Sequence, residues 1–260
     1  MKCPKCGYQR QASDTHVHEG ICPNCSIAYK KWHIHDKPQK NAFINHAGIN
    51  TSDDYESTDL TQEQQAGLGK QFYEAFFSVP ERVTTVGFYA RLILFAVFML
   101  WGGYFILGGI DWSRIGGSFL HNVILPFHEF GHVFFAPFGR FMAILGGSLF
   151  QVMMPLGLLL VFSIKYKDNF AAAIMLWWSG QSFIDISPYI LDARYRSLPL
   201  VGGRGESSHD WGNLLTMTNN LQNTEFIAGF AFVIGTLLII LSGIWGALLL
   251  YKMKQNINDI

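Results

Sequence analysis

The sequence predicts a mainly α-helical, polytopic membrane bundle of about five spans, headed by a small N-terminal zinc-ribbon domain. Half of the 260 residues are hydrophobic and 15% are charged, whereas soluble domains carry roughly 25% charged residues. The apolar residues gather in long runs after residue 85, and all four cysteines lie near the N-terminus. The formal net charge of zero argues against a basic nucleic-acid binder, and the composition argues against a disordered chain.

This uneven composition divides the chain into four parts. We expect a zinc ribbon over residues 1–30, and a linker with an amphipathic juxtamembrane helix over residues 31–85. A membrane domain follows over residues 86–251, and a polar tail over residues 252–260.

The ribbon is predicted by two Cys-x-x-Cys pairs, which are formed by Cys3, Cys6, Cys22 and Cys25. Two such pairs at this separation are typical of a structural site with four thiolate ligands to zinc. Disulfides would need an oxidising compartment, and a redox motif needs only one pair. We therefore expect one structural zinc ion, and a ribbon that binds a cytoplasmic protein partner.

The juxtamembrane helix is predicted from Thr61, where Gln64 stands in capping-box position. Leu68, Phe72 and Phe76 then fall on one helical face, and Pro80 ends the pattern. We expect this face to lie on the bilayer surface; packing against the ribbon is the alternative.

The spans are predicted from length, since about 20 apolar residues cross a bilayer. Three charge-free runs are long enough: Leu92–Ile110, Phe141–Ile164 and Ile227–Tyr251. Ile115–Gly139 and Asn169–Leu191 are also long enough but contain ionisable residues. Five spans result.

The orientation follows from Lys and Arg, which are enriched on the cytoplasmic side. Ten of the 19 precede the first span. Five crossings add four more to the same side: Arg140, Arg194, Arg196 and Arg204. The other side then holds five, including Lys252 and Lys254. We therefore expect a multi-pass protein of a prokaryotic cell membrane with a cytoplasmic N-terminus, and the count puts the C-terminus on the opposite side.

The second predicted span carries His128-Glu129-Phe-Gly-His132. On a helix the two histidines project from one face and can share a zinc ion, while Glu129 can act as a general base. An ionisable residue deep in a span costs roughly 2.5–3.5 kcal/mol, so this cluster needs a compensating partner. We expect that partner to be a catalytic zinc; a buried salt-bridge cluster is the alternative.

Zinc needs a third protein ligand and an open position. Asp185 and Asp192 lie near one face of the fourth predicted span, and His209-Asp210 follows a glycine-rich segment. A plain helix N-cap by Ser208 or Asp210 is an equally good interpretation of that last segment.

At this point the chain resembles the site-two protease family of intramembrane zinc metalloproteases. A membrane-embedded His-Glu-x-x-His is followed two spans later by Asp185-Ile-Ser-Pro-Tyr-Ile-Leu-Asp192-Ala, where the family has roughly Asn-x-x-Pro and then Leu-Asp-Gly. The resemblance implies that Asp192 is the third zinc ligand and that Asp185 takes the place of the family's Asn. Depth in the membrane favours Asp185 instead, and His209 is the third alternative.

The resulting functional hypothesis is a zinc metalloendopeptidase that cleaves membrane-spanning protein substrates. Glu129 would be catalytic, His128, His132 and Asp192 would bind zinc, and Gly146, Gly147 or Gly180 would let a substrate approach, unless they are helix-packing contacts. The alternative is a non-proteolytic zinc-binding membrane protein that acts as an adaptor or handles metal. The expected partners are the lipid bilayer and a membrane protein, not nucleic acid.

Overall fold

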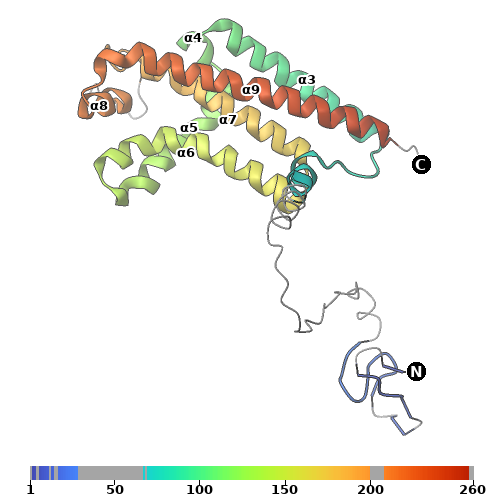
Figure 1. Ribbon diagram of the computed structural model, residues 1–260. Coiled ribbons are helices and arrows are strands. Elements are labelled where there is room, and N and C mark those ends of the chain that lie inside the picture. The colour runs from blue at the N-terminus through green and yellow to red at the C-terminus, as the bar shows by residue number, and fades with distance from the viewer. Residues whose placement is uncertain are drawn as a thin grey trace, which may run out of the picture. The chain divides into compact units, whose positions relative to one another are not determined.

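The structure of the protein is a computed structural model. It describes residues 2–28 apart from 4, 5, 12, 15 and 16, then residues 67, 69–199 and 208–257. The chain divides into two compact units, Met1–Tyr55 and Glu56–Ile260. The predicted linker over residues 31–66, the predicted start of the juxtamembrane helix and the glycine-rich segment around Arg204 lie outside the described residues. The predicted mainly helical fold is confirmed (Figure 1).

Two similar turns build the N-terminal unit. The Cys3 carbonyl accepts a hydrogen bond from the Gly7 N–H at 3.0 Å, and the Cys3 N–H donates to Tyr8 at 2.8 Å. Cys22 and Ser26 occupy the equivalent positions in the second turn, where the Ser26 N–H donates to the Cys22 carbonyl at 2.9 Å. Gly7 and Ser26 both have positive φ, 72° and 57°. Each Cys-x-x-Cys pair is therefore folded back by the same backbone geometry.

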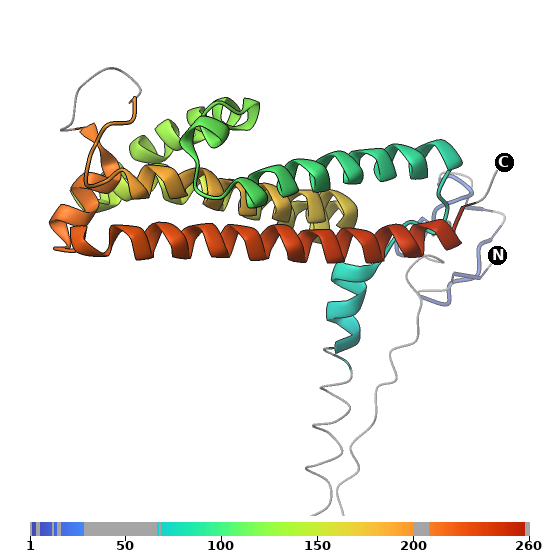
Figure 2. The same cartoon turned by 90° about the horizontal axis from the view of Figure 1, so that it is seen from above.

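The second unit is a bundle of helices (Figure 2). In chain order these are α3 (Thr85–Gly108), α4 (Trp112–Ile115), α5 (Phe119–Phe135), η1 (Ala136–Phe138), α6 (Arg140–Leu160), η2 (Val161–Tyr166), α7 (Asn169–Leu191), α8 (Asp210–Met217), η4 (Leu221–Asn223) and α9 (Thr224–Gln255). Side chains cap the starts of α3 to α5 and α7, with Thr84, Asp111, Ser118 and Asp168 accepting backbone N–H bonds. These are the residue types that helix N-termini favour.

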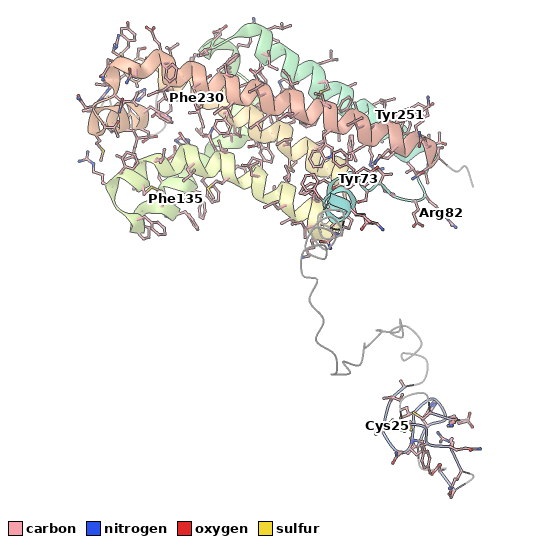
Figure 3. The ribbon with its side chains drawn as sticks, in the orientation of Figure 1. Cys25, Tyr73, Arg82, Phe135, Phe230 and Tyr251 are labelled. Atoms are coloured by element: carbon pink, nitrogen blue, oxygen red, sulfur yellow. The ribbon has the colours of Figure 1, made fainter. Side chains whose placement is uncertain are left out.

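Helices α3 and α7 start at one end of the bundle, and α6 with η2 and α9 end there, so the two pairs run in opposite directions. A β-bridge from Val83 to Ile257 joins the start of α3 to the end of α9. The Ser163 hydroxyl donates to Asn169 at 2.9 Å, which joins the end of α6 and η2 to the start of α7. We name this the arm end, formed by residues 69–85, 161–169 and 250–257. Figure 3 shows Tyr73, Arg82 and Tyr251 gathered there.

The opposite end holds the start of α6, the end of α7, helix α8 and the start of α9. We name it the cavity end, formed by residues 132–143, 189–199 and 208–226. Figure 3 shows Phe135 and Phe230 toward this end. Helix α3 stops short of it, since its Gly102 packs on Ile239 of α9 and only six more residues of α3 follow.

Helix α5 does not connect the two ends. Because α3 starts at the arm end and α6 leads back to it, the segment 109–139 between them begins and ends away from that end. Within it, α5 lies antiparallel against the first half of α6, with Gly131 packed on Gly146. Its 17 residues cover roughly 25 Å at 1.5 Å per residue, less than a bilayer core of about 30 Å. This differs from the expected crossing of Ile115–Gly139.

Three helical segments are long and apolar enough to cross a membrane: Thr85–Gly108, Arg140–Tyr166 and Leu221–Gln255. They contain the predicted charge-free runs Phe141–Ile164 and Ile227–Tyr251 whole, and Leu92–Ile110 apart from its last two residues. Helix α7 lies at the centre, and most of its residues are buried. Pro188 does not unwind α7, which continues to Leu191. The described residues thus confirm a helical bundle with three membrane-length helices, and the count of five spans stays a prediction.

Residues 69–77 form a helix that is fastened to the end of α9. Trp245 Nε1 donates to the Phe76 carbonyl at 2.8 Å, and Lys252 Nζ donates to the Phe77 carbonyl at 3.1 Å. Asn256 Nδ2 donates to the Pro80 carbonyl at 2.9 Å. The segment that leads into α3 therefore lies at the same end of the bundle as the end of α9. The five-span arrangement had placed these two segments on opposite sides.

Candidate metal centres

The four cysteines of the N-terminal unit converge, with Sγ atoms within 4.8 Å of one another. Cys3 Sγ lies 3.7 Å from Cys25 Sγ, and Cys6 Sγ lies 3.7 Å from Cys22 Sγ. Four sulfurs bound tetrahedrally to zinc at about 2.3 Å lie roughly 3.8 Å apart. The arrangement therefore fits a four-thiolate metal site, as the spacing predicts.

Backbone N–H groups prepare two of these thiols for metal binding. The N–H of Tyr8 is the largest cause that lowers the pKa of Cys6. Burial raises the pKa of Cys22, but the N–H groups of Cys25 and Asn24 outweigh it and lower the pKa to about 6. Because the thiolate is the form that binds metal, these N–H groups favour ligation by Cys6 and Cys22, whereas burial raises the pKa of Cys25 to about 12.

A second convergent group lies in the helical bundle. Helix α5 presents His128 and His132 on one face, and Asp210 is the first residue of α8. Asp210 Oδ2 lies 3.2 Å from His128 Nε2 and 3.3 Å from His132 Nε2. The three ligand atoms lie within 4.8 Å of one another. Residues 82 positions apart in the chain thus supply one potential ligand set.

Hydrogen bonds on the far side of each imidazole orient the two rings. His128 Nδ1 lies 2.7 Å from Gln151 Oε1, and Gln151 Nε2 donates to the Ser182 carbonyl at 3.1 Å. His132 Nδ1 lies 2.8 Å from the Ala143 carbonyl. Since both Nδ1 atoms face acceptors, they carry the protons and leave Nε2 free as a ligand. This is the usual environment of histidines that bind metals in proteins.

The residues present fit a zinc ion. Two unprotonated nitrogens and a carboxylate oxygen are acceptors only, so a metal cation can bind all three; protonated histidines paired with Asp210 are the salt-bridge alternative. Donors bound tetrahedrally at about 2.0–2.1 Å lie roughly 3.3 Å apart, which agrees with the two distances to Asp210 Oδ2. Gly147 of α6 leaves room on the remaining side, because a Cβ there would lie 2.6 Å from both Nε2 atoms.

Helix α8 places Asp210 through three contacts. The Asp210 N–H donates to Tyr189 Oη at 2.9 Å, and Trp211 Nε1 donates to Ser148 Oγ at 3.0 Å. His209 caps the helix by accepting the Gly212 N–H at 2.9 Å. The N-cap is thus His209, and neither Ser208 nor Asp210.

His128, His132, Tyr189 and Asp210 line one cavity of about 630 Å³. Glu129 lines it beside the histidines, and its side chain is exposed to it. Trp112, Ile124 and Ile186 supply apolar wall, and Arg140 lies at the first turn of α6. A carboxylate, a candidate metal centre and an apolar wall therefore share one space large enough for a short peptide segment.

The structure gives the other sequence candidates different partners. Asp192 accepts from the Ser197 N–H, the Ser197 hydroxyl and the Leu198 N–H at 2.7–3.0 Å, and His209 Nε2 lies 3.2 Å from it. Asp185 lies 3.0 Å from His121 Nδ1. Neither Asp185, Asp192 nor His209 joins the group of His128 and His132. Asp210 does, although the resemblance had pointed to Asp192.

Sequence reasoning also missed Gln151 and Tyr189, which orient His128 and Asp210. A glutamine in the middle of an otherwise apolar helix was the available signal for Gln151, because a buried amide needs partners. Tyr189 had no such signal, since tyrosine is common in membrane helices.

No family model matches the chain, and comparisons with curated proteins and with solved structures find no match either.

Proposed function

We propose that the protein is a membrane-embedded zinc metalloendopeptidase. The observation that carries this proposal is the convergence of His128 Nε2 and His132 Nε2 on Asp210 Oδ2, at 3.2 and 3.3 Å, in a cavity that Glu129 also lines. His128, His132 and Asp210 would hold the ion. A bound zinc ion would polarise a scissile carbonyl and lower the pKa of water in the site.

Glu129 supplies the proton chemistry in this proposal. Its carboxylate is next to the first histidine, is exposed to the cavity, and makes no ion pair among the described residues. It accepts a proton from the attacking water and passes it to the nitrogen of the leaving peptide, the usual task of a general base and acid.

The substrate is a peptide that lies in or next to the membrane. Support comes from the three membrane-length helices and from the apolar part of the cavity wall. A helix hides its peptide carbonyls in its own hydrogen bonds, so the bond to be cleaved must belong to an extended segment. The similarity of the His-Glu-x-x-His motif to site-two proteases favours the same substrate class.

The test is a comparison of peptide fragments in membranes of cells that produce the wild-type chain or Glu129→Gln. Gln keeps the shape of Glu but cannot accept the proton, so fragments present with the wild type should fall by 10²-fold or more. Zinc content of the purified chain should be unchanged, because Glu129 is not a ligand.

Glu225→Gln is the matched control, since Glu225 is an exposed glutamate in the first turn of α9. It should leave the fragments unchanged. Equal fragments from wild type and Glu129→Gln, with zinc retained in both, would support the non-proteolytic alternative instead.

A further inference from the structure

The arm end gathers the segments at which the chain enters and leaves the bundle. Residues 69–83 lead into α3 at this end, and the end of α9 is hydrogen-bonded to them through Lys252 and Asn256. Asn169 at the start of α7 also donates to the Ser78 carbonyl at 3.0 Å. Three segments far apart in the sequence therefore reach the same side of the bundle.

The metal cavity belongs to the other end. Arg140 begins α6, Tyr189 lies in the last turn of α7, and Leu198 and Asp210 belong to the segments after it. Arg140, Leu198, Asp210 and Asn213 line the cavity, and residues of the arm end do not, within the described ranges. The described lining of the cavity therefore lies away from the arm end.

Basic residues are divided unequally in the sequence between the N-terminal region with the arm end and the rest of the chain. Ten of the 19 precede Leu92, and Lys165, Lys167, Lys252 and Lys254 at the arm end bring that side to 14. The other five are all arginines: Arg114, Arg140, Arg194, Arg196 and Arg204. Every lysine of the chain thus lies in the N-terminal region or at the arm end. Segments rich in Lys and Arg stay in the cytoplasm.

The cysteines agree with this orientation. Four unpaired thiols close enough to bind one metal persist in a reducing compartment. The sequence between the cysteines and residue 69 has no charge-free apolar run long enough to cross a bilayer. The sequence therefore predicts no membrane span between the ribbon and residue 69.

We propose that the arm end is cytoplasmic and that the metal cavity lies toward the extracytoplasmic side. This deepens the proposed function and rests on it for the substrate class: the enzyme acts on peptide segments presented from the extracytoplasmic half of the membrane. The five-span arrangement gave the same numerical division of basic residues but put the cavity near the cytoplasm, because it treated segment 115–139 as a crossing.

The experiment is cysteine labelling in intact bacterial cells with a membrane-impermeant maleimide. Tyr195 at the cavity end and Tyr166 at the arm end are both tyrosines with exposed side chains, at 75% and 61%, so Tyr195→Cys and Tyr166→Cys are a matched pair. The wild-type chain is the control that gives the background labelling of the four native cysteines. Tyr195→Cys should be labelled in intact cells, and Tyr166→Cys only after the membrane is permeabilised.

Arg194→Cys and Lys254→Cys repeat the comparison at the same two ends, in case one tyrosine variant fails to accumulate. Labelling of the arm-end variants in intact cells, or protection of the cavity-end variants until permeabilisation, overturns the proposal. Labelling does not require activity. A correct labelling pattern with no loss of fragments in Glu129→Gln would therefore reject the peptidase and keep the orientation.

Discussion

His209 Nε2 lies 3.2 Å from Asp192 Oδ2, and this pair joins the end of α7 to the start of α8. His209 Nδ1 accepts the Gly212 N–H, so the proton must be on Nε2, which donates to Asp192. Both ring nitrogens of His209 therefore make hydrogen bonds, and the Asp192 carboxylate also accepts hydrogen bonds from the N–H groups of Ser197 and Leu198. Two residues considered as zinc ligands instead hold Asp210, the next residue after His209, in place.

This relationship distinguishes Asp210, the proposed zinc ligand, from Asp192, a positioning residue. Asp210→Asn should lose the zinc of the bundle, because an amide is a poorer ligand than a carboxylate and no other acid lies within the group. Asp192→Asn should keep the ion but weaken its affinity by roughly 10- to 100-fold, as changes outside the ligand sphere do. Zinc per chain, measured by mass spectrometry over a series of chelator concentrations, checks both, with the ribbon zinc as internal reference.

Asp185→Asn is the control for that series, since Asp185 pairs with His121 and not with the ligand set. Its zinc content should equal that of the wild type. Loss of zinc in Asp192→Asn with full retention in Asp210→Asn would reject Asp210 and restore the ligand that the site-two protease resemblance implies.

Gly147 offers a second test, from the α6 side of the centre. A Cβ at this position would lie 2.6 Å from His128 Nε2 and from His132 Nε2, where the ion is expected. Gly147→Ala should therefore abolish zinc binding in the bundle. Gly157→Ala, on the same helix with nothing within 4 Å of its Cβ, should bind zinc normally. Equal zinc in the two variants would place the ion elsewhere.

The orientation of His128 depends on Gln151. Gln151→Met keeps the length of the side chain but removes the acceptor 2.7 Å from His128 Nδ1. The imidazole can then place its proton on Nε2, which competes with metal, so zinc affinity should fall by roughly 10- to 100-fold. Gln222→Met, at an exposed position in η4, is the control. Unchanged zinc affinity in Gln151→Met would show that this hydrogen bond is not needed.

Local pattern was sufficient for part of this architecture. The two Cys-x-x-Cys pairs predicted a cluster that the structure brings together, and His128 and His132 meet because they are four residues apart on one helix. Charge-free runs predicted the three membrane-length helices. In each case the information lies within a few turns of the chain, where helical and turn geometry decide the outcome.

The rest depends on contacts between distant segments. Segment 115–139 has enough apolar residues to cross a bilayer. Its helix α5 packs instead against the first half of α6, with Gly131 on Gly146, and the segment begins and ends away from the arm end. Asp210, and not Asp192, lies beside the histidines because α8 packs on α6 through Trp211 and Ser148, which no spacing along the chain reveals. Long-range packing of this kind decided both the topology and the third member of the site.

The ribbon gives a prediction that is independent of the bundle. Ser26 has φ of 57°, where its counterpart Gly7 has φ of 72°. A residue with a Cβ is destabilised by about 1 kcal/mol in this left-handed backbone conformation. Metal binding drives the folding of such small units, so this cost weakens the apparent affinity for zinc. In a peptide of residues 1–30, Ser26→Gly should therefore tighten zinc binding about fivefold, measured by competition with a chromophoric chelator.

Gly7→Ser makes the opposite exchange at the equivalent position, and it should weaken zinc binding by a similar factor. The two variants change the same backbone requirement in opposite directions without altering any sulfur ligand. Circular dichroism of the zinc-loaded peptides should show the same ordered state in both, so that the difference is one of stability. Equal affinity of both variants and the wild type would mean that the two turns are not strained at these positions. A peptide that stays disordered with excess zinc at neutral pH would reject the four-thiolate site itself.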